Sequence, residues 1–359
     1  MARKSRRELA KDRGDLGDLP ITVKDVALRA GVSPITVSRA IQRPELVSDA
    51  TRTHVLEVVR AMGYVPNLMA GGLATSKSRL VAIVLPTIAN SIYASVVQAI
   101  MDRLAEAGYH ALVGPSGYTP EHEEALLAAI LGRRPDGIVL TGTFHTQASR
   151  VRLSSAGIPV VEAWDLSNDG LDMQVGFSHE QVGAAVAEHF FARGYRRWAV
   201  IGVDDPRAQR RCHAVIERLA TLGVDSVAVQ TLPLPATWEV GRKGLANLLN
   251  AGERPDFIFC SSDTVALGVL AEAATRGLNV PGDLAVLGFG DTLNGQFANP
   301  ALSTVSVNAT EMGNQVAEAL LRRFDGQSSE PSRDTGFAII ERGSTDQAQA
   351  CDKRLGSLG

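Results

Sequence analysis

The most constraining feature of this chain is an alternation of short, wholly apolar runs with amphipathic segments, which begins at Leu80. The run LVAIVLP (80–86) precedes the helical pattern SIYASVVQAIMDRLAEAGY, and DFIFCSS (256–262) precedes DTVALGVLAEAATRG. Fully apolar strands separated by amphipathic helices are typical of parallel sheets covered by helices on both faces. The pattern is too long for one typical sheet, so it predicts an α/β body of two doubly wound lobes.

The composition agrees with an ordinary core-forming chain, since 45% of residues are hydrophobic and 21% are charged. The apolar runs are far shorter than the roughly 20 residues of a membrane span, and no apolar run follows the charged N-terminus as in a signal peptide. Cys212, Cys260 and Cys351 lie far apart, which predicts neither a disulfide framework nor a metal site. Together these features favour a cytoplasmic location.

The net charge of −3 conceals an asymmetry along the chain. Residues 1–80 carry 14 Lys and Arg against 8 Asp and Glu, whereas the rest of the chain carries 22 against 31. A basic head on an acidic body is expected where only the head meets an anionic polymer. A solvated basic tail would show the same charges, and residues 1–20 are polar enough for a flexible arm that contacts nothing.

Three short helices are predicted between residues 22 and 62. The first has apolar residues at helical spacing from Val23 to Ala30, and Gly31 permits the left-handed turn that ends it. Ser33 caps the second helix, with Pro34 at its first position. The third helix is capped by Ser48 and is closed by the glycine of the following GYVP segment.

Two helices of about eight residues joined by a glycine turn are marginal alone. Such a pair is expected where the second helix lies in the major groove of DNA and the first supports it. A plain helical hairpin in a larger α domain would have the same spacing. The second helix exposes hydroxyls, an arginine and an amide, which base edges and phosphates require. Its N-terminal and outward side chains are Ser33, Pro34, Ile35, Thr36, Ser38, Arg39 and Gln42.

The run DVALRAGVSPITVSR (25–39) and the later GYVPN (63–67) resemble the DNA-binding head of the lactose repressor family. The resemblance extends to about residue 342. It implies a helix-turn-helix head, a hinge helix, and a two-lobed body like that of periplasmic sugar-binding proteins. It also implies a dimer or dimer of dimers on a near-palindromic operator, with DNA affinity changed by a ligand in the cleft. The predicted domains are an arm (1–20), the head (21–66), the hinge helix (67–78), the body (79–345) and a frayed tail (346–359).

The resemblance assigns base reading to Pro34, Ile35 and Arg39. Pro34 and Ile35 can contact a thymine methyl group but cannot donate a hydrogen bond from their side chains, so the guanidinium of Arg39 becomes the expected reader of guanine. Contacts to phosphates are implied for Ser33, Thr36, Ser38, Thr51 and Asn67.

Residues 67–76 match the hinge helix of the family, which includes Ala70. Leu73 occupies the position of the leucine that wedges between base pairs in the minor groove, unless it is simply a core leucine. Gly71 and Gly72 each cost about 1 kcal/mol of helix stability. This segment is therefore predicted to fold when two copies pack on DNA.

The ligand is expected at the carboxyl ends of the strands, between the two lobes. Hydroxyls, carboxylates, amides and aromatic rings follow those ends and suit a polyol. The candidates besides arginines are Thr87, Asn90, Tyr93, Ser116, Glu162, Trp164, Ser262, Asp263, Asp291 and Gln296. Four plainer alternatives remain open: Asp263 as a helix N-cap, Asp204 and Asp205 as turn residues, Trp164 as core, and His145 as a surface residue.

Arg207, Arg210 and Arg211 are the cations available to pair with a carboxylate. The family places one effector-binding arginine just before the helix that begins near His213, which favours Arg211, with Arg210 second. Several stretches of the body resemble the gluconate-responsive branch of the family, which implies a sugar-acid effector such as gluconate. The alternatives for the effector are 2-ketogluconate and a neutral sugar. The alternative for the function is an activator in place of a repressor.

Enzymatic motifs are lacking from the sequence: there is no G-x-S-x-G, H-E-x-x-H, P-loop or G-x-G-x-x-G segment. No catalytic residue, metal or cofactor is therefore predicted. A solute-binding protein would share the body but not the basic three-helix head. No heptad pattern marks the C-terminus, which favours a dimer over a tetramer.

Overall fold

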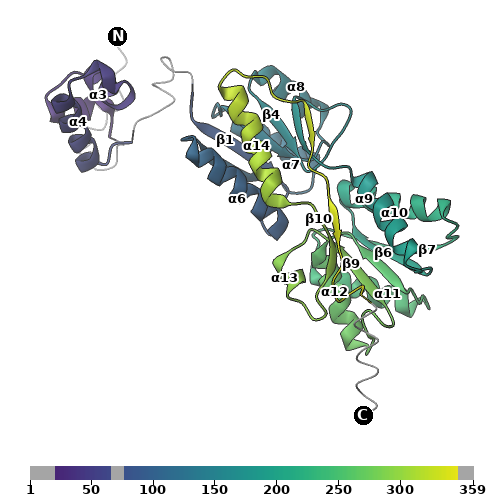
Figure 1. Ribbon diagram of the computed structural model, residues 1–359. Coiled ribbons are helices and arrows are strands. Elements are labelled where there is room, and N and C mark those ends of the chain that lie inside the picture. The colour runs from purple at the N-terminus through teal and green to yellow at the C-terminus, as the bar shows by residue number, and fades with distance from the viewer. Residues whose placement is uncertain (1–20, 66–76, 347–359) are drawn as a thin grey trace, which may run out of the picture. The chain divides into compact units, whose positions relative to one another are not determined.

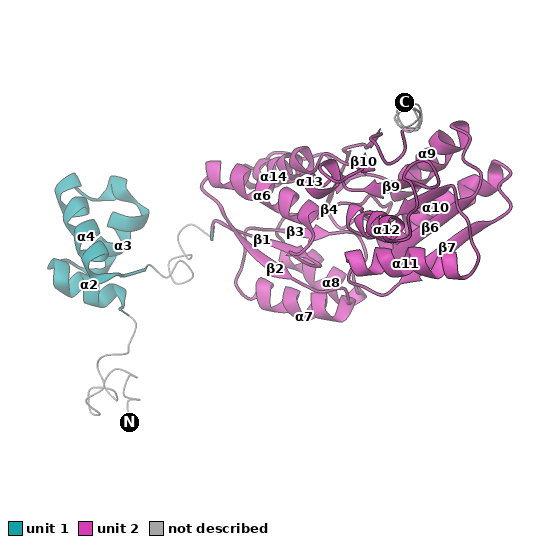
Figure 2. Cartoon of the chain, turned by 90° about the horizontal axis from the view of Figure 1, so that it is seen from below, with its two compact units in different colours: residues 1–78 teal, residues 79–359 magenta. Residues whose placement is uncertain are grey.

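The computed structural model describes residues 21–65 and 77–346 (Figure 1). The chain divides into two compact units, residues 1–78 and 79–359 (Figure 2). The predicted arm, most of the hinge helix and nearly all of the predicted tail lie outside the described residues. The same holds for the predicted DNA contacts Asn67, Ala70 and Leu73.

The first unit contains the three predicted helices, α2 (Val23–Ala30), α3 (Pro34–Gln42) and α4 (Asp49–Met62). A 3₁₀ turn, η1 (Pro44–Leu46), joins the last two. Ser33 and Ser48 cap α3 and α4, and Gly31 and Gly63 end α2 and α4 in left-handed conformations, as predicted. The small core of this unit comprises Val26, Ala27, Ala30, Val37, Ala40 and Val55.

The second unit contains two six-stranded sheets, which confirms the prediction of two doubly wound lobes. In each sheet the first strand of the lobe lies inside and its partners flank it on both sides. The N-terminal sheet runs in the order β11 (Ser332–Asp334), β5 (Met173–Gly176), β4 (Val160–Ala163), β3 (Gly137–Thr141), β1 (Leu80–Leu85) and β2 (His110–Pro115). The C-terminal sheet runs in the order β12 (Ala338–Ile340), β10 (Ser303–Ser306), β9 (Ala285–Phe289), β8 (Phe257–Cys260), β6 (Trp198–Val203) and β7 (Val227–Leu232).

Helices cover both faces of each sheet (Figure 1). The amphipathic pattern of the helices and the apolar strands between them require this arrangement. Within the described residues, no helix combines the length and apolarity that crossing a bilayer needs. The N-terminal lobe carries α6 (Ser91–Glu106), α7 (Pro120–Leu131), α8 (Gln147–Ala156) and α14 (Ala309–Phe324). The C-terminal lobe carries α9 (His179–Ala192), α10 (Pro206–Thr221), α11 (Trp238–Asn250), α12 (Asp263–Thr275) and the short α13 (Leu293–Gln296).

The chain passes between the lobes at three places within the described body: after β5, between β10 and α14, and between β11 and β12. As a result α14 packs against α6, and β11 pairs with β5, although both come late in the sequence. The sequence pattern did not predict this return. The strands β11 and β12 have only three residues each and lie at sheet edges, so they lack the apolar runs of central strands.

Two glycines allow α11 and α12 to cross backbone to backbone. A Cβ atom at Gly241 would lie 2.0 Å from the carbonyl oxygen of Val265. A Cβ atom at Gly268 would lie 2.1 Å from the carbonyl oxygen of Trp238. This close approach fixes the start of α12, where Ser262 and Asp263 stand at the edge of the interlobe cleft.

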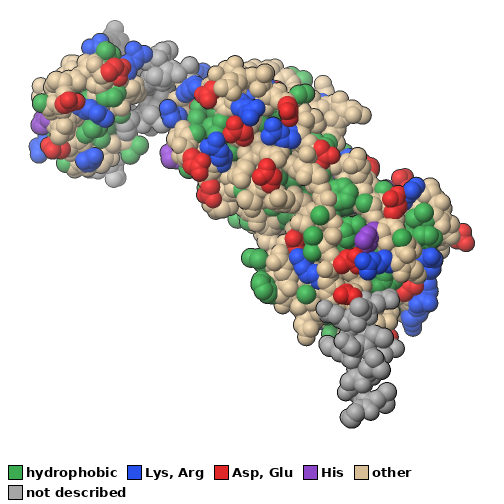
Figure 3. Space-filling view, in the orientation of Figure 1, with side chains coloured by type: hydrophobic (Ala, Val, Ile, Leu, Met, Phe, Trp, Pro, Cys, Tyr) green, Lys and Arg blue, Asp and Glu red, His purple; other side chains and the backbone are tan. Residues whose placement is uncertain are grey.

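The surface charge of the body is mixed on the face that Figure 3 shows. Lys and Arg side chains are interspersed there with Asp and Glu over the N-terminal lobe. Ion pairs of the N-terminal lobe include Arg103 with Glu318 and Arg323 with Asp172. Exposed pairs of this kind contribute little stability each.

Candidate DNA-binding surface and effector cavity

The predicted recognition helix α3 exposes the face that the sequence assigns to contact with DNA. The Oγ of Ser33 accepts a hydrogen bond from the Thr36 backbone N–H at 3.2 Å. Val37 and Ala40 are buried, while Ile35 remains 63% exposed. Arg39 is exposed, and its guanidinium has no ion pair or hydrogen bond within residues 21–65 and 77–346. The outward face of α3 therefore presents an uncommitted cation beside apolar and hydroxyl groups.

The remaining described candidates of this unit lie on α3 and in the first turn of α4. Thr51 stands in the first turn of α4, and its hydroxyl lies 2.9 Å from the hydroxyl of Ser48. Ser38 and Gln42 are partly exposed on α3. Backbone N–H groups and hydroxyls at helix N-termini are common contacts to phosphate.

Two small cavities lie between the lobes of the second unit. The inner cavity, of about 60 Å³, brings together seven of the predicted residues: Asn90, Tyr93, Trp164, Arg207, Arg211, Ser262 and Asp263. It also includes Asp205, for which the sequence left a turn role open, and residues that the sequence did not single out: Ile92, His179, Ser261, Thr264, Phe289 and Thr292. The outer cavity, of about 130 Å³, contains Ser116 with the rings of Tyr118 and Phe144.

Asp205 and Arg207 line both cavities and form an ion pair between them, with Nη2 2.8 Å from Oδ2. Asp205 also caps α10 by accepting from the Ala208 N–H, so it is not merely a turn residue. Burial alone would lower the pKa of Arg207, but the Asp205 carboxylate helps to raise it above its usual range. Arg207 is therefore a charge that the protein itself neutralises.

Arg211 differs, because no carboxylate of the described residues lies within ion-pair distance of it. Its Nη2 donates to the Ser261 carbonyl at 2.8 Å, and its Nη1 lies 3.0 Å from Nδ1 of His179. The guanidinium also stacks over the Phe289 ring at 3.8 Å. Burial lowers the pKa of Arg211 below its usual range, but an arginine remains protonated.

His179 is neutral in this setting, because burial and the nearby charge of Arg211 hold its pKa well below the usual range. Its Nδ1 accepts from Arg211, so its proton resides on Nε2. Among the described residues, neither this Nε2 nor the Arg211 Nε nor the Ser261 Oγ has a hydrogen-bond partner. The inner cavity thus contains three buried polar groups that a ligand rich in acceptors would satisfy.

Comparisons with known proteins match the head and the body of the chain to two family models. The model of bacterial regulatory proteins of the lacI family matches residues 22–67, and the model of a periplasmic binding protein-like domain matches residues 187–345. The HTH-type transcriptional regulator GntR of Pseudomonas aeruginosa is 36% identical over 328 residues, which cover 90% of this chain and 95% of that protein. The chain belongs to the LacI family. It is a DNA-binding transcriptional regulator and not an enzyme.

Other members of the LacI family match a similar share of the chain. GntR of Escherichia coli is 32% identical, with 90% of this chain and 98% of that protein covered. The HTH-type transcriptional repressor CytR of Escherichia coli is 29% identical over 90% of this chain and 96% of that protein. A solved LacI-family regulator from Silicibacter pomeroyi is 32% identical with a TM-score of 0.86, covering 91% of this chain and all of that one.

Arg210 lines neither cavity of this LacI-family regulator. Its Nη1 lies 2.6 Å from the Asp165 Oδ2 of the N-terminal lobe, and its Nε lies 2.6 Å from Oε1 of Glu180. The Asp165 side chain is fully buried, and burial raises the pKa of this carboxyl although Arg210 opposes the shift. Arg210 therefore bridges the lobes instead of facing the candidate ligand site.

The N-cap of α12 is Ser262 and not Asp263, which corrects one alternative from the sequence. Ser262 Oγ accepts from the Val265 N–H at 3.3 Å. Asp263 is buried and accepts from the Thr304 hydroxyl at 2.6 Å and the Thr292 N–H at 2.7 Å. Burial raises the pKa of the Asp263 carboxyl.

Four other predicted residues lie outside the inner cavity and the outer cavity. Thr87 accepts from the Ala89 N–H, and Glu162 accepts from the Leu171 N–H. Asp291 pairs with Arg342, and the Gln296 amide donates to the Asp291 backbone carbonyl. Asp291 instead lines a third, larger pocket.

The expectation that His145 is a surface residue is wrong. Its side chain is fully buried, with Nδ1 2.6 Å from Glu123 Oε1 and Nε2 3.4 Å from Glu162 Oε1. Burial alone would lower the pKa of His145, but the hydrogen bond to Glu123 and the nearby Glu162 carboxylate raise it to about 9. Nothing local marks this histidine, because the two glutamates come from α7 and β4.

Proposed function

We propose that the effector of this LacI-family regulator is a sugar acid of the gluconate class, and that Arg211 binds its carboxylate in the inner cavity. The observation that carries this proposal is a buried guanidinium without a carboxylate partner, surrounded by unsatisfied groups on His179 and Ser261. Leaving a buried charge and buried donors unpaired is costly. A carboxylate with adjacent hydroxyls would satisfy all of them, and the resemblance to gluconate-responsive regulators supports the same class of ligand.

Binding of such an acid requires a change in the cleft. Ligand pockets commonly measure about 300–1,000 Å³, whereas the inner cavity measures about 60 Å³. The ion pair of Asp205 and Arg207 separates it from the outer cavity. We infer that the acid enters as this pair and the lobes rearrange, and that the rearrangement changes affinity for DNA.

The direct test is fluorescence anisotropy with DNA from the region upstream of this gene, at fixed salt, with and without gluconate and 2-ketogluconate. We expect specific binding that gluconate releases, which corresponds to a repressor acting in the cytoplasm. Release by 2-ketogluconate alone would move the assignment to that acid. Tight binding to DNA that neither acid changes would contradict the sugar-acid proposal but would still agree with sequence-specific DNA binding.

Arg39 is proposed to read a guanine of the operator, and Arg39→Ala should cost about 1–3 kcal/mol of binding with relaxed preference at one base pair. The measurement is anisotropy against an operator and its single-base variants. Arg60→Ala, an exposed change on α4, is the matched control and should weaken binding to all variants equally. An unchanged preference in Arg39→Ala would assign base reading to other residues.

The wedge role proposed for Leu73 predicts that Leu73→Ala weakens specific binding but leaves weak, salt-sensitive binding nearly intact.

A homodimer is proposed from the resemblance and from two apolar side chains at α13. Leu293 is 69% exposed and Phe297 is 85% exposed. Covering them by a second copy would recover apolar burial and would present two heads to a near-palindrome. The double change Leu293→Ser with Phe297→Ser should raise the dimer dissociation constant at least about tenfold by sedimentation equilibrium. Val229→Ser, at the exposed edge strand β7, is the control and should leave the dimer unchanged.

A further inference from the structure

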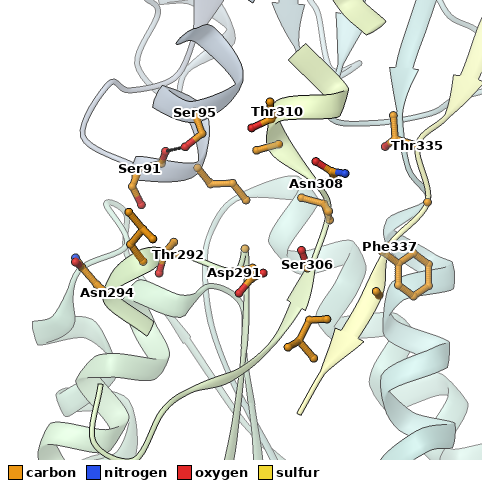
Figure 4. Close-up of a pocket in the computed structure, with 18 residues that line it drawn as sticks. Ser91, Ser95, Asp291, Thr292, Asn294, Ser306, Asn308, Thr310, Thr335 and Phe337 are labelled. Carbon is orange, nitrogen blue, oxygen red and sulfur yellow. Dashed lines mark hydrogen bonds between the residues drawn. The ribbon is translucent and has the colours of Figure 1, made fainter. Parts of the chain in front are cut away.

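A third pocket, of about 780 Å³, lies beside α13 (Figure 4). It is lined by the start of α6 and by residues 290–294. Leu293 belongs to this lining, and the proposed homodimer covers that exposed side chain with a second copy of the chain. The pocket therefore belongs to the proposed dimer surface, and no ligand is proposed for it.

The outer cavity contains a buried carboxylate that the proposed function does not use. Glu123 of α7 lines this cavity and is only 9% exposed. Its Oε1 lies 2.6 Å from Nδ1 of His145, whereas its Oε2 has no hydrogen-bond partner among the described residues. A buried polar atom without a partner is costly. Glu123 therefore presents an unsatisfied acceptor to the outer cavity.

The surroundings of Glu123 stay negatively charged at neutral pH. His145 lies between Glu123 and Glu162, and its pKa of about 9 means that the imidazole is protonated. One positive charge and two negative charges leave a net charge of −1 for this cluster. Glu162 is fully buried and lines neither cavity, so Glu123 is the carboxylate of the cluster that a ligand can reach.

Charged side chains line both cavities, and most of them already have partners. Those of the inner cavity are Arg207, Arg211, Asp205 and Asp263, and those of the outer cavity are Arg207, Asp205 and Glu123. Arg207 pairs with Asp205 at the boundary, and Asp263 accepts three hydrogen bonds from within the protein. The groups left for a ligand are therefore a cation at the inner end, Arg211, and a carboxylate at the outer end, Glu123.

The inner cavity is too small for a whole sugar acid. Its volume of about 60 Å³ corresponds to about four to six water-sized groups, which is fewer than the non-hydrogen atoms of a six-carbon acid. If the carboxylate of the acid lies on Arg211, the rest of its chain extends past Asp205 and Arg207. The space beyond that ion pair is the outer cavity, of about 130 Å³.

The lining of the outer cavity suits the hydroxyl end of a sugar acid. The rings of Tyr118 and Phe144 supply apolar surface for C–H groups. The Ser116 and Thr141 hydroxyls donate to the backbone carbonyls of Leu85 and Val84, so their oxygens remain available as acceptors. The outer cavity thus offers acceptors to hydroxyl groups, whereas the inner cavity offers donors to a carboxylate.

We propose that the outer cavity binds the far end of the acid, with the terminal hydroxyl donating to Glu123 Oε2, so that the effector is an aldonic monoacid and not a diacid of the same length. This inference rests on the proposed function, because it takes the first carboxylate to lie on Arg211. A hydroxyl that donates to a carboxylate forms a charge-assisted hydrogen bond. A second carboxylate in place of that hydroxyl would be repelled by Glu123.

The test is isothermal titration calorimetry of the full chain at neutral pH with gluconate, glucarate, and 6-deoxygluconate, which lacks the terminal hydroxyl. We expect gluconate to bind at least about tenfold tighter than 6-deoxygluconate and at least about 100-fold tighter than glucarate. Glu123→Gln should weaken gluconate binding about fivefold and strengthen glucarate binding at least about tenfold. The reason is that the amide oxygen can still accept from His145, while the NH2 group replaces Oε2.

Glu162→Gln is the matched control, because Glu162 contacts the same histidine but lines neither cavity. It should leave the affinity for each of the three acids within about twofold. Circular dichroism checks that both variants are folded. The comparison of gluconate with 6-deoxygluconate uses the unchanged protein, so it does not depend on the folding of any variant.

Three results would overturn the proposal. The first is equal binding of gluconate and 6-deoxygluconate, because the terminal hydroxyl would then make no contact. The second is glucarate binding that Glu123→Gln leaves unchanged. The third is an equal effect of Glu162→Gln, because both changes would then act through His145. In each case, loss of gluconate binding in Arg211→Gln would still support the proposed function, whereas binding of none of the three acids would contradict both.

Discussion

Arg211→Gln should abolish the response of DNA binding to gluconate, with gluconate affinity reduced by about 100-fold or more. Truncating one partner of a buried, hydrogen-bonded charge pair costs about 2–5 kcal/mol. Arg211 is buried against Phe289, so water cannot replace the lost contacts easily. Affinity for DNA without ligand should stay within about threefold, since the change removes no contact to DNA. Calorimetry with gluconate and anisotropy with operator DNA measure the two quantities.

Arg210→Gln is the matched comparison, because Arg210 is the adjacent arginine on the same helix. Its guanidinium bridges to Asp165 and Glu180 and lines neither cavity. Gluconate affinity should therefore change less than about tenfold in this variant. If Arg210→Gln lost the response of DNA binding to gluconate and Arg211→Gln kept it, the assignment of Arg211 would be wrong. The carboxylate of the ligand would then bind Arg210, where it bridges the lobes. Arg211→Lys should fall between the variants, because it keeps the charge but loses the planar fork.

The stability of the body should fall by about 3 kcal/mol between about pH 6 and about pH 9.5 through the titration of His145. The pKa of His145 is about 9 in the folded protein, against an ordinary value of about 6.5 in the unfolded chain. A raised folded pKa means that the stabilisation is fully present below the unfolded value and is lost as the pH rises through 9. The fully buried side chain between Glu123 and Glu162 is the physical origin.

The measurement is urea unfolding of the full chain across this pH range, with the transition of the body followed by tryptophan fluorescence. His145→Gln should lose most of the pH-dependent difference, because glutamine does not titrate. His122→Gln, an exposed change near the start of the same helix as Glu123, is the control and should behave like the unchanged protein. An equal loss of stability in the unchanged protein and in His145→Gln would assign the pH dependence to other groups.

Local signals in the sequence determined the architecture of this protein. Ser33 and Ser48 as caps, and Gly31 as the end of α2, act on their nearest neighbours along the chain, so their effect can be read without a fold. The apolar runs of the central strands act in the same way, because a strand buried on both faces needs them whatever its partners are. The three short helices of the head and the two lobes followed from such signals, whereas the LacI family itself was predicted from the resemblance of residues 25–39 and 63–67.

Only the tertiary structure distinguished the three arginines at the start of α10. Arg207, Arg210 and Arg211 lie within five residues, but Arg207 pairs with Asp205, Arg210 bridges to the other lobe, and Arg211 has no carboxylate partner. A helix turns about 100° per residue, so adjacent side chains meet different surroundings. The return of α14 and β11 to the first lobe, and the burial of His145, were decided in the same way. Each depends on contacts between residues distant in the sequence, which no local pattern records.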